Sequence, residues 1–135
     1  MSNQIVNDVI PQTFYDSYKS KYTEDLDVAT FDFTTQRQKL DNLDWKGLSL
    51  DEDTIFAELE AYQRLLRLDP NQAVADELKD AGYQSAHQIA AIPEDQFIQS
   101  VQGNGQIDIE KARTIYRKAM DIKQRTALVY ANVKD

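Results

Sequence analysis

The chain has 135 residues, of which 23 are Asp or Glu and 15 are Lys or Arg, so its net charge is −8 and its isoelectric point lies near 4.6. Hydrophobic residues make up 41% of the chain, a share typical of a globular domain rather than a disordered one. With no cysteine and one histidine, disulfides, thiolate metal sites and histidine-rich metal sites are excluded, and no cofactor is expected.

The first residues, MSNQIVNDVIPQTFYDSYKS, lack the basic segment and continuous apolar run of a signal peptide. No apolar stretch is long enough to cross a bilayer, so we expect no membrane insertion by this segment. Synthesis in the cytoplasm is therefore expected, and release or export without a signal peptide is left open.

Residues 1–48 are expected to form an N-terminal arm that is partly helical and partly irregular. Pro11 suits the first turn of a helix that ends near Tyr22. Aromatic side chains recur at helical spacing within it: Phe14, Tyr15 and Tyr18.

After this helix, apolar and polar residues alternate over residues 28–33, which predicts a short extended segment anchored by Phe31 and Phe33. A short helix is expected over residues 35–43, and Gly47 is expected to close the region.

Residues 49–135 are expected to form an all-α, multi-helical domain. Ser49 with Glu52 predicts a capping box at the start of its first helix. Asp69 and Pro70 predict the start of the next helix, and Gly82 its end. The first helix carries one apolar stripe: Ile55, Phe56, Leu59, Tyr62, Leu65, Leu66 and Leu68.

Two helix-hairpin-helix-like units are expected in the rest of this domain. Ser85 with Gln88 predicts a second capping box, and Pro93 opens another short helix. After a turn at residues 103–105, Asp108 is expected to cap a long C-terminal helix. Eight apolar residues are expected to meet in one core: Phe56, Leu59, Leu66, Leu78, Ile89, Phe97, Ile115 and Ala119.

Charge is unevenly spread, with a net charge of −6 over residues 1–68 and of +5 over residues 111–125. Two interpretations of the basic helix stay open: it faces the acidic N-terminal third or water, or it docks an acidic partner. The candidate docking residues are Lys111, Arg113, Arg117, Lys118, Lys123 and Arg125.

Catalytic interpretations of the remaining polar residues are weak. The acidic run at residues 51–53 is explained by its place in a first helical turn, and Glu58 and Glu60 do not converge on a helix. His87 has no nucleophile or carboxylate at a recognisable spacing. We therefore expect that the chain is not an enzyme.

Three stretches, AYQRLLRLDP, VADELKDAGYQSAHQIAAIPEDQFI and IEKARTIYRKAMDIKQRTALVYANV, resemble the N-terminal helical region of the A components of Tc-type insecticidal toxin complexes and related virulence-plasmid A proteins. The resemblance covers about residues 58–133 and rests on packing and turn positions such as Gly82 and Phe97. It implies a bacterial, virulence-associated helical scaffold whose partners are other protein chains or domains, including toxin-complex subunits. It carries over no functional residue.

The alternative hypothesis is a helix-hairpin-helix adaptor that binds nucleic acid or a nucleic-acid-processing partner. In such units backbone N–H groups hold a phosphate and need nearby cations. No Lys or Arg occurs from residue 80 to residue 110, whereas five acidic residues do. The sequence therefore favours a non-catalytic protein-interaction module over nucleic-acid binding.

Overall fold

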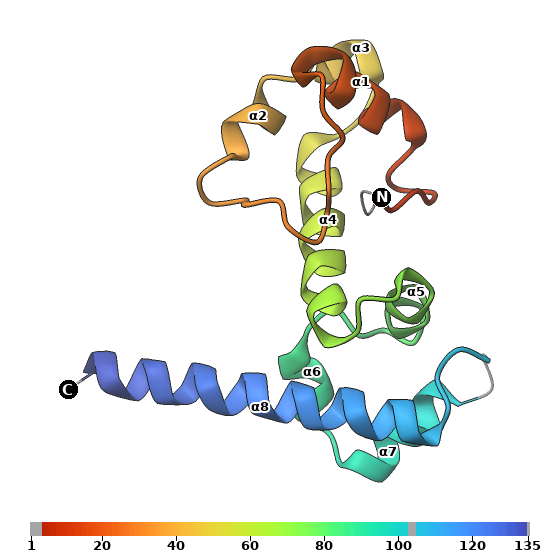
Figure 1. Ribbon diagram of the computed structural model, residues 1–135, viewed down its shortest axis with the longest axis vertical. Helices are drawn as coiled ribbons and strands as arrows, with labels where there is room; N and C mark the ends of the chain where they lie inside the picture. Colours follow the sequence, from red (N-terminus) through yellow and green to blue (C-terminus); the bar gives the residue numbers. More distant parts are fainter. Residues whose placement is uncertain (1–3, 103–104, 135) are drawn as a thin grey trace. The chain divides into compact units, whose positions relative to one another are not determined.

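The structure, a computed structural model, describes residues 4–102 and 105–134, and side chains up to residue 126 (Figure 1). The described residues form eight helices and no strand, which confirms the all-α prediction. The chain divides into two compact units, residues 1–63 and 64–135. The boundary expected between residues 48 and 49 therefore falls inside the first unit.

In the first unit, α1 (Gln12–Tyr22) begins after Pro11 and buries its three aromatic side chains, as the spacing predicted. The residues before it turn back at Asn7, whose side-chain oxygen accepts hydrogen bonds from the backbone N–H groups of Val9 and Ile10, both at 2.8 Å. The Tyr15 hydroxyl donates to the carbonyl oxygen of Ile5 at 2.6 Å. These bonds hold the N-terminal segment against α1.

The extended segment predicted over residues 28–33 is wrong, because the backbone turns at residues 28–30. The Asp27 carboxylate accepts a hydrogen bond from the N–H of Ala29 at 3.0 Å, and this local bond competes with an extended backbone. Anchoring by the two phenylalanines is confirmed: Phe31 is buried, and Phe33 lies between Phe31 and Phe56, with ring centroids 5.0 and 6.1 Å away.

A glutamine ties this turn to the long helix of the first unit. The Gln63 side chain donates to the carbonyl oxygens of Val28 and Phe31, at 3.0 and 2.6 Å. The segment between α1 and α2 (Arg37–Asp41) therefore runs beside α4 (Glu52–Leu68), as Figure 1 shows.

The capping box predicted at Ser49 is wrong. Ser49 has a φ of 56° and ends α3 (Trp45–Leu48), a short helix that includes Gly47. Asp51 instead caps α4, because its carboxylate accepts hydrogen bonds from the backbone N–H and the hydroxyl of Thr54. All seven residues of the predicted apolar stripe on α4 are buried.

The second unit contains the last residues of α4 followed by α5 (Gln72–Asp80), α6 (Ala86–Ala90), α7 (Glu94–Val101) and α8 (Ile109–Lys134). Asn71 caps α5 by accepting from the N–H of Ala73, so the prediction that Asp69 and Pro70 start this helix is corrected. Gly82, with a φ of 97°, ends α5 as predicted. Its N–H donates to Lys79 and that of Tyr83 to Leu78, which is a Schellman motif.

The predicted caps of α6 and α8 are confirmed. The Ser85 hydroxyl accepts from the N–H of Gln88, whose side chain accepts in turn from the N–H of Gln84. Asp108 accepts from the N–H of Lys111 at 2.7 Å. Of the turn expected at residues 103–105, only Gly105 lies among the described residues.

All eight predicted core residues are buried, but they are distributed over the two units. Phe56 and Leu59 belong to the first unit, and the other six to the second. In the second unit Phe97 lies between Tyr83 and Tyr116, with ring centroids 5.3 and 6.0 Å away. The Tyr116 hydroxyl donates to the carbonyl oxygen of Ile92 at 2.7 Å, which fixes α8 against the loop between α6 and α7.

The first unit also contains a carboxyl pair. Glu52 shares a hydrogen bond with Asp41, and one oxygen of Glu52 is buried without a hydrogen-bond partner. This bond, followed by partial burial and the charges of Asp41 and Asp53, raises the pKa of Glu52 above its usual value of 4.5. A carboxyl whose pKa is raised by folding stabilises the folded state below pH 4.5, and that contribution is lost as the pH rises through the folded-state pKa.

We predict that Glu52→Gln stabilises the protein at pH 7 relative to the unchanged chain, and that this difference shrinks towards pH 4. Urea unfolding at both pH values measures it, with Asp8→Asn, an exposed carboxylate of the same unit, as the control. A stability difference between Glu52→Gln and the unchanged chain that is the same at both pH values would contradict a raised pKa of Glu52.

Candidate protein-docking surface on α8

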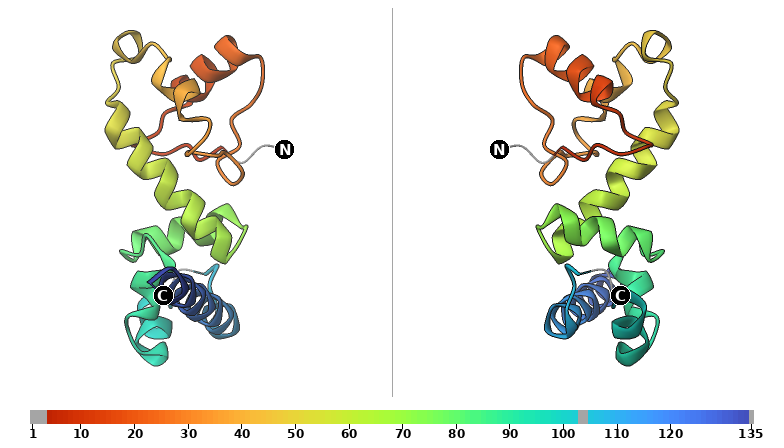
Figure 2. Two further views of the ribbon diagram at one scale, coloured as in Figure 1. Left: turned by 90° about the vertical axis from the view of Figure 1, so that its left-hand side faces the viewer. Right: turned by 90° about the vertical axis from the view of Figure 1, so that its right-hand side faces the viewer.

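Packing against α6 and α7 decides which side of α8 is free. Ala112, Ile115 and Ala119 are completely buried, and Ile122 is half-buried. Figure 2, which looks along α8, shows α6 and α7 on one side of it. Figure 1 shows α8 continuing past α6 with no other helix of the second unit beside it. The opposite side of α8 is therefore exposed within this unit.

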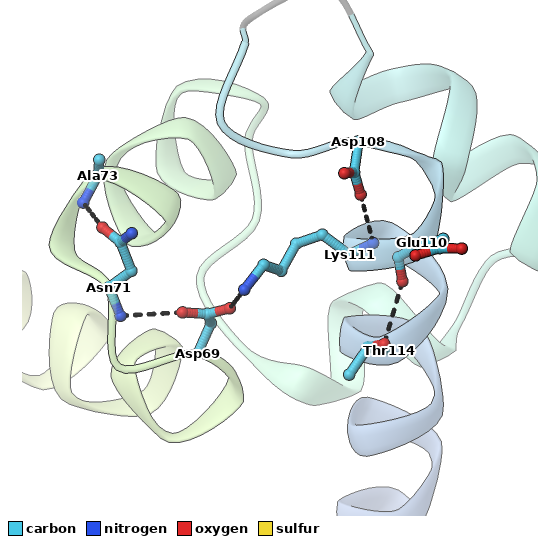
Figure 3. A network of polar contacts seen from close by, with 7 residues as sticks. All are labelled: Asp69, Asn71, Ala73, Asp108, Glu110, Lys111 and Thr114. Atoms are coloured by element: carbon cyan, nitrogen blue, oxygen red, sulfur yellow. Dashed lines mark hydrogen bonds and ion pairs between the residues drawn. The ribbon is translucent and has the colours of Figure 1, made fainter.

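A partly buried ion pair fixes the start of α8 (Figure 3). The Lys111 ammonium donates to the Asp69 carboxylate at 2.7 Å, and the other Asp69 oxygen accepts from the N–H of Asn71 at 2.9 Å. The Asp69 side chain is only 9% exposed, whereas that of Lys111 is 41% exposed. The Asp69 carboxylate also raises the pKa of Lys111 above its usual value.

Lys111 is thus paired within the chain, and nothing in the sequence identifies Asp69 as its partner. The sequence predicts a helix start at Asp69, yet this residue joins the end of α4 to α5 and, across 42 residues, to α8. An Asp followed by Pro is compatible with both roles, so no local signal could separate them.

The other five predicted residues, Arg113, Arg117, Lys118, Lys123 and Arg125, are all exposed. Arg125 pairs with Asp121 at 2.9 Å, one turn earlier on the same helix. Arg113, Arg117, Lys118 and Lys123 form no ion pair within the described part of the chain.

The helical period does not bring these side chains into a single stripe. At about 3.6 residues per turn, Arg113 and Arg117 lie one turn apart, roughly opposite the buried alanines. Lys118 lies on one flank of this side. Lys123 lies near the side of α8 that is buried against α6 closer to the start of α8. Arg113, Arg117 and the flanking Lys118 form what we call the outer α8 surface.

Acidic residues on the same side do not cancel this charge. Asp121 is paired with Arg125. Glu110 lies in the first turn of α8, where its negative charge interacts favourably with the helix dipole. Between Lys111 and Thr126, α8 carries five basic residues and one acidic residue. Residues 64–135 as a whole hold ten basic and ten acidic residues. The positive charge of this unit is thus concentrated on α8.

The helix-hairpin-helix-like unit shows no positive charge at the places where a phosphate would bind. Side chains cap the N-terminus of α6 at Ser85 and that of α8 at Asp108. Asp108 and Glu110 would also repel a phosphate at the start of α8. His87 is exposed on α6.

The described residues contain no group of three or more His, Asp or Glu side chains arranged to hold a metal ion. Among them, no helix is both long enough and apolar enough to cross a membrane. Searches with protein-family models, among curated proteins and among solved structures find no match to this chain.

We predict that Asp69→Ala destabilises the protein by about 1–3 kcal/mol, because it removes a charged hydrogen bond and leaves the N–H of Asn71 without its acceptor. Asp80→Ala, at an exposed site on α5, changes the free energy of unfolding by less than about 0.5 kcal/mol. Urea unfolding measures both changes in the free energy of unfolding. Equal changes for the two variants would show that the ion pair contributes nothing to stability.

Proposed function

We propose that this chain is a non-catalytic protein-interaction module that docks an acidic protein partner through the outer α8 surface. The observation that carries the proposal is the exposure of Arg113, Arg117 and Lys118 without ion pairs in the described structure. Arg in particular presents a planar set of donors that matches a carboxylate. A rigid helix held by a core on its other side keeps these cations in a fixed register.

The number of cations on the outer α8 surface and the net charge of the chain favour a protein over a nucleic acid as the partner. Each phosphate contact changes the logarithm of affinity by about 0.9 per tenfold change in salt, and specific DNA-binding proteins make about six to ten of them. The outer α8 surface offers three cations, and the chain carries a net charge of −8. DNA carries negative charge along its whole length, so repulsion from the chain opposes the small gain from those three contacts, whereas a protein partner needs only a local acidic patch.

The resemblance of residues 58–133 to Tc-type toxin A components supports a narrower form of this proposal. In that form, the module is a virulence-associated scaffold and its partner is another domain or subunit of the toxin complex. The alternative is the helix-hairpin-helix adaptor. The peptide and DNA titrations described next distinguish it from a protein-docking module.

We predict that Arg113→Glu/Arg117→Glu weakens binding of a fluorescent Glu- and Ala-based helical peptide by about 5- to 30-fold. This corresponds to roughly 1–2 kcal/mol for two reversed surface charges. Fluorescence anisotropy at physiological salt measures the affinity. Lys46→Glu/Arg67→Glu, which changes the net charge equally at exposed positions elsewhere, leaves the affinity within about twofold.

A short DNA duplex is titrated in parallel. No DNA binding by the unchanged chain is the expected result. DNA binding that the Arg113→Glu/Arg117→Glu variant abolishes would overturn the proposal in favour of the adaptor. Equal weakening of peptide binding by both double variants would show that only net charge matters.

A further inference from the structure

The first unit contains a polar pocket that the docking proposal does not use. Its volume is about 190 Å³, below the roughly 300–1,000 Å³ of sites that enclose a whole drug-sized ligand. Residues of α1, α2 and the segment between them line it, including Tyr18, Glu24, Asp27, Thr30 and Lys39. A pocket of this size fits one end group of a ligand.

Most of the charge around the pocket is already paired. The Lys39 ammonium donates to Glu24 at 2.7 Å, and Lys19 pairs with Asp25 at 3.3 Å. Lys39 also lies over the ring of Tyr22, 5.3 Å from its centroid. Asp27 has no cationic partner within the described structure, although one of its oxygens accepts from the N–H of Ala29. Its second oxygen leaves one negative charge available to a ligand.

The other lining groups extend this chemistry. Tyr18 and Phe31 also line the pocket, but both are buried, at 2% and 6% exposure, so they present little ring surface to it. The Tyr18 hydroxyl reaches Glu24 only at 3.3 Å. The side chains of Thr30 and Gln36 line the pocket and form no hydrogen bond in the described part of the chain. An unpaired carboxylate and free polar groups together suit a cation that carries several hydrogen-bond donors.

We infer that this pocket binds the guanidinium or ammonium end group of a ligand, with Asp27 as the charged acceptor. A guanidinium suits the site best, because it combines a positive charge with several N–H donors for the carboxylate and the neutral polar groups that line the pocket. The end group can come from a small free amine or from an Arg or Lys side chain of a protein.

The test uses ethylguanidinium chloride and its uncharged analogue N-ethylurea, each titrated into the full chain while backbone amide signals are followed by NMR. We expect ethylguanidinium, and not N-ethylurea, to shift the signals of residues 24–39 saturably. Equal shifts with both compounds, or no saturable shift with either, would overturn the inference.

Two variants with opposite expected effects keep the test independent of folding defects. Asp27→Asn retains an oxygen that can accept from Ala29 but removes the charge, so we expect at least about fivefold weaker binding. Lys39→Gln removes a competing cation, so we expect tighter binding. Asp16→Asn, on the exposed side of α1, should change affinity by less than about twofold. Unchanged affinity in both Asp27→Asn and Lys39→Gln would contradict the site.

Agmatine and the blocked tripeptide Ac-Ala-Arg-Ala-NH₂ then distinguish the two sources of the end group. Tighter binding of agmatine supports a small free amine, and tighter binding of the tripeptide supports an arginine side chain of a protein.

Discussion

The ion pair between Asp69 and Lys111 is the constraint on which the proposed docking surface depends. It joins the junction of α4 and α5 to the first turn of α8 and thereby fixes how α8 is rotated about its own axis. With Lys111 turned inward, Ala112 and Ile115 face the core, and Arg113 and Arg117 must face outward. Together with the packing of its apolar side against α6 and α7, this partly buried contact determines which cations of α8 are exposed.

The two units use polar side chains in the same structural way. In the first, Gln63 holds the turn at residues 28–31 against α4; in the second, Asp69 holds α8 near α5. The Gln63 amide nitrogen donates twice and both Asp69 oxygens accept, so these groups avoid the cost of an unpaired buried group. Both contacts connect segments that are distant in sequence, which is why the irregular segments keep a defined course.

Local signals predicted the helices well because caps and apolar stripes act within a few residues. Ser85, Asp108 and Gly82 perform the predicted roles. The failures at Ser49, Asp69 and residues 28–33 arose where two local solutions compete and distant contacts decide between them. For the candidate surface, the sequence predicted six docking cations, of which five are exposed, but it could not show that Lys111 is paired. The pocket near Asp27 had no sequence signal at all, because a turn creates it.

The claim that the outer α8 surface docks an acidic protein is tested most directly by photo-crosslinking in the source cells. A photoreactive amino acid replaces Gln124 in one variant and, as the control, Glu94 on α7 in the other, and crosslinked material is analysed by mass spectrometry. We predict protein crosslinks from position 124 alone, to peptides rich in Asp and Glu. Crosslinks to nucleic acid, or the same protein crosslinks from both positions, would contradict it.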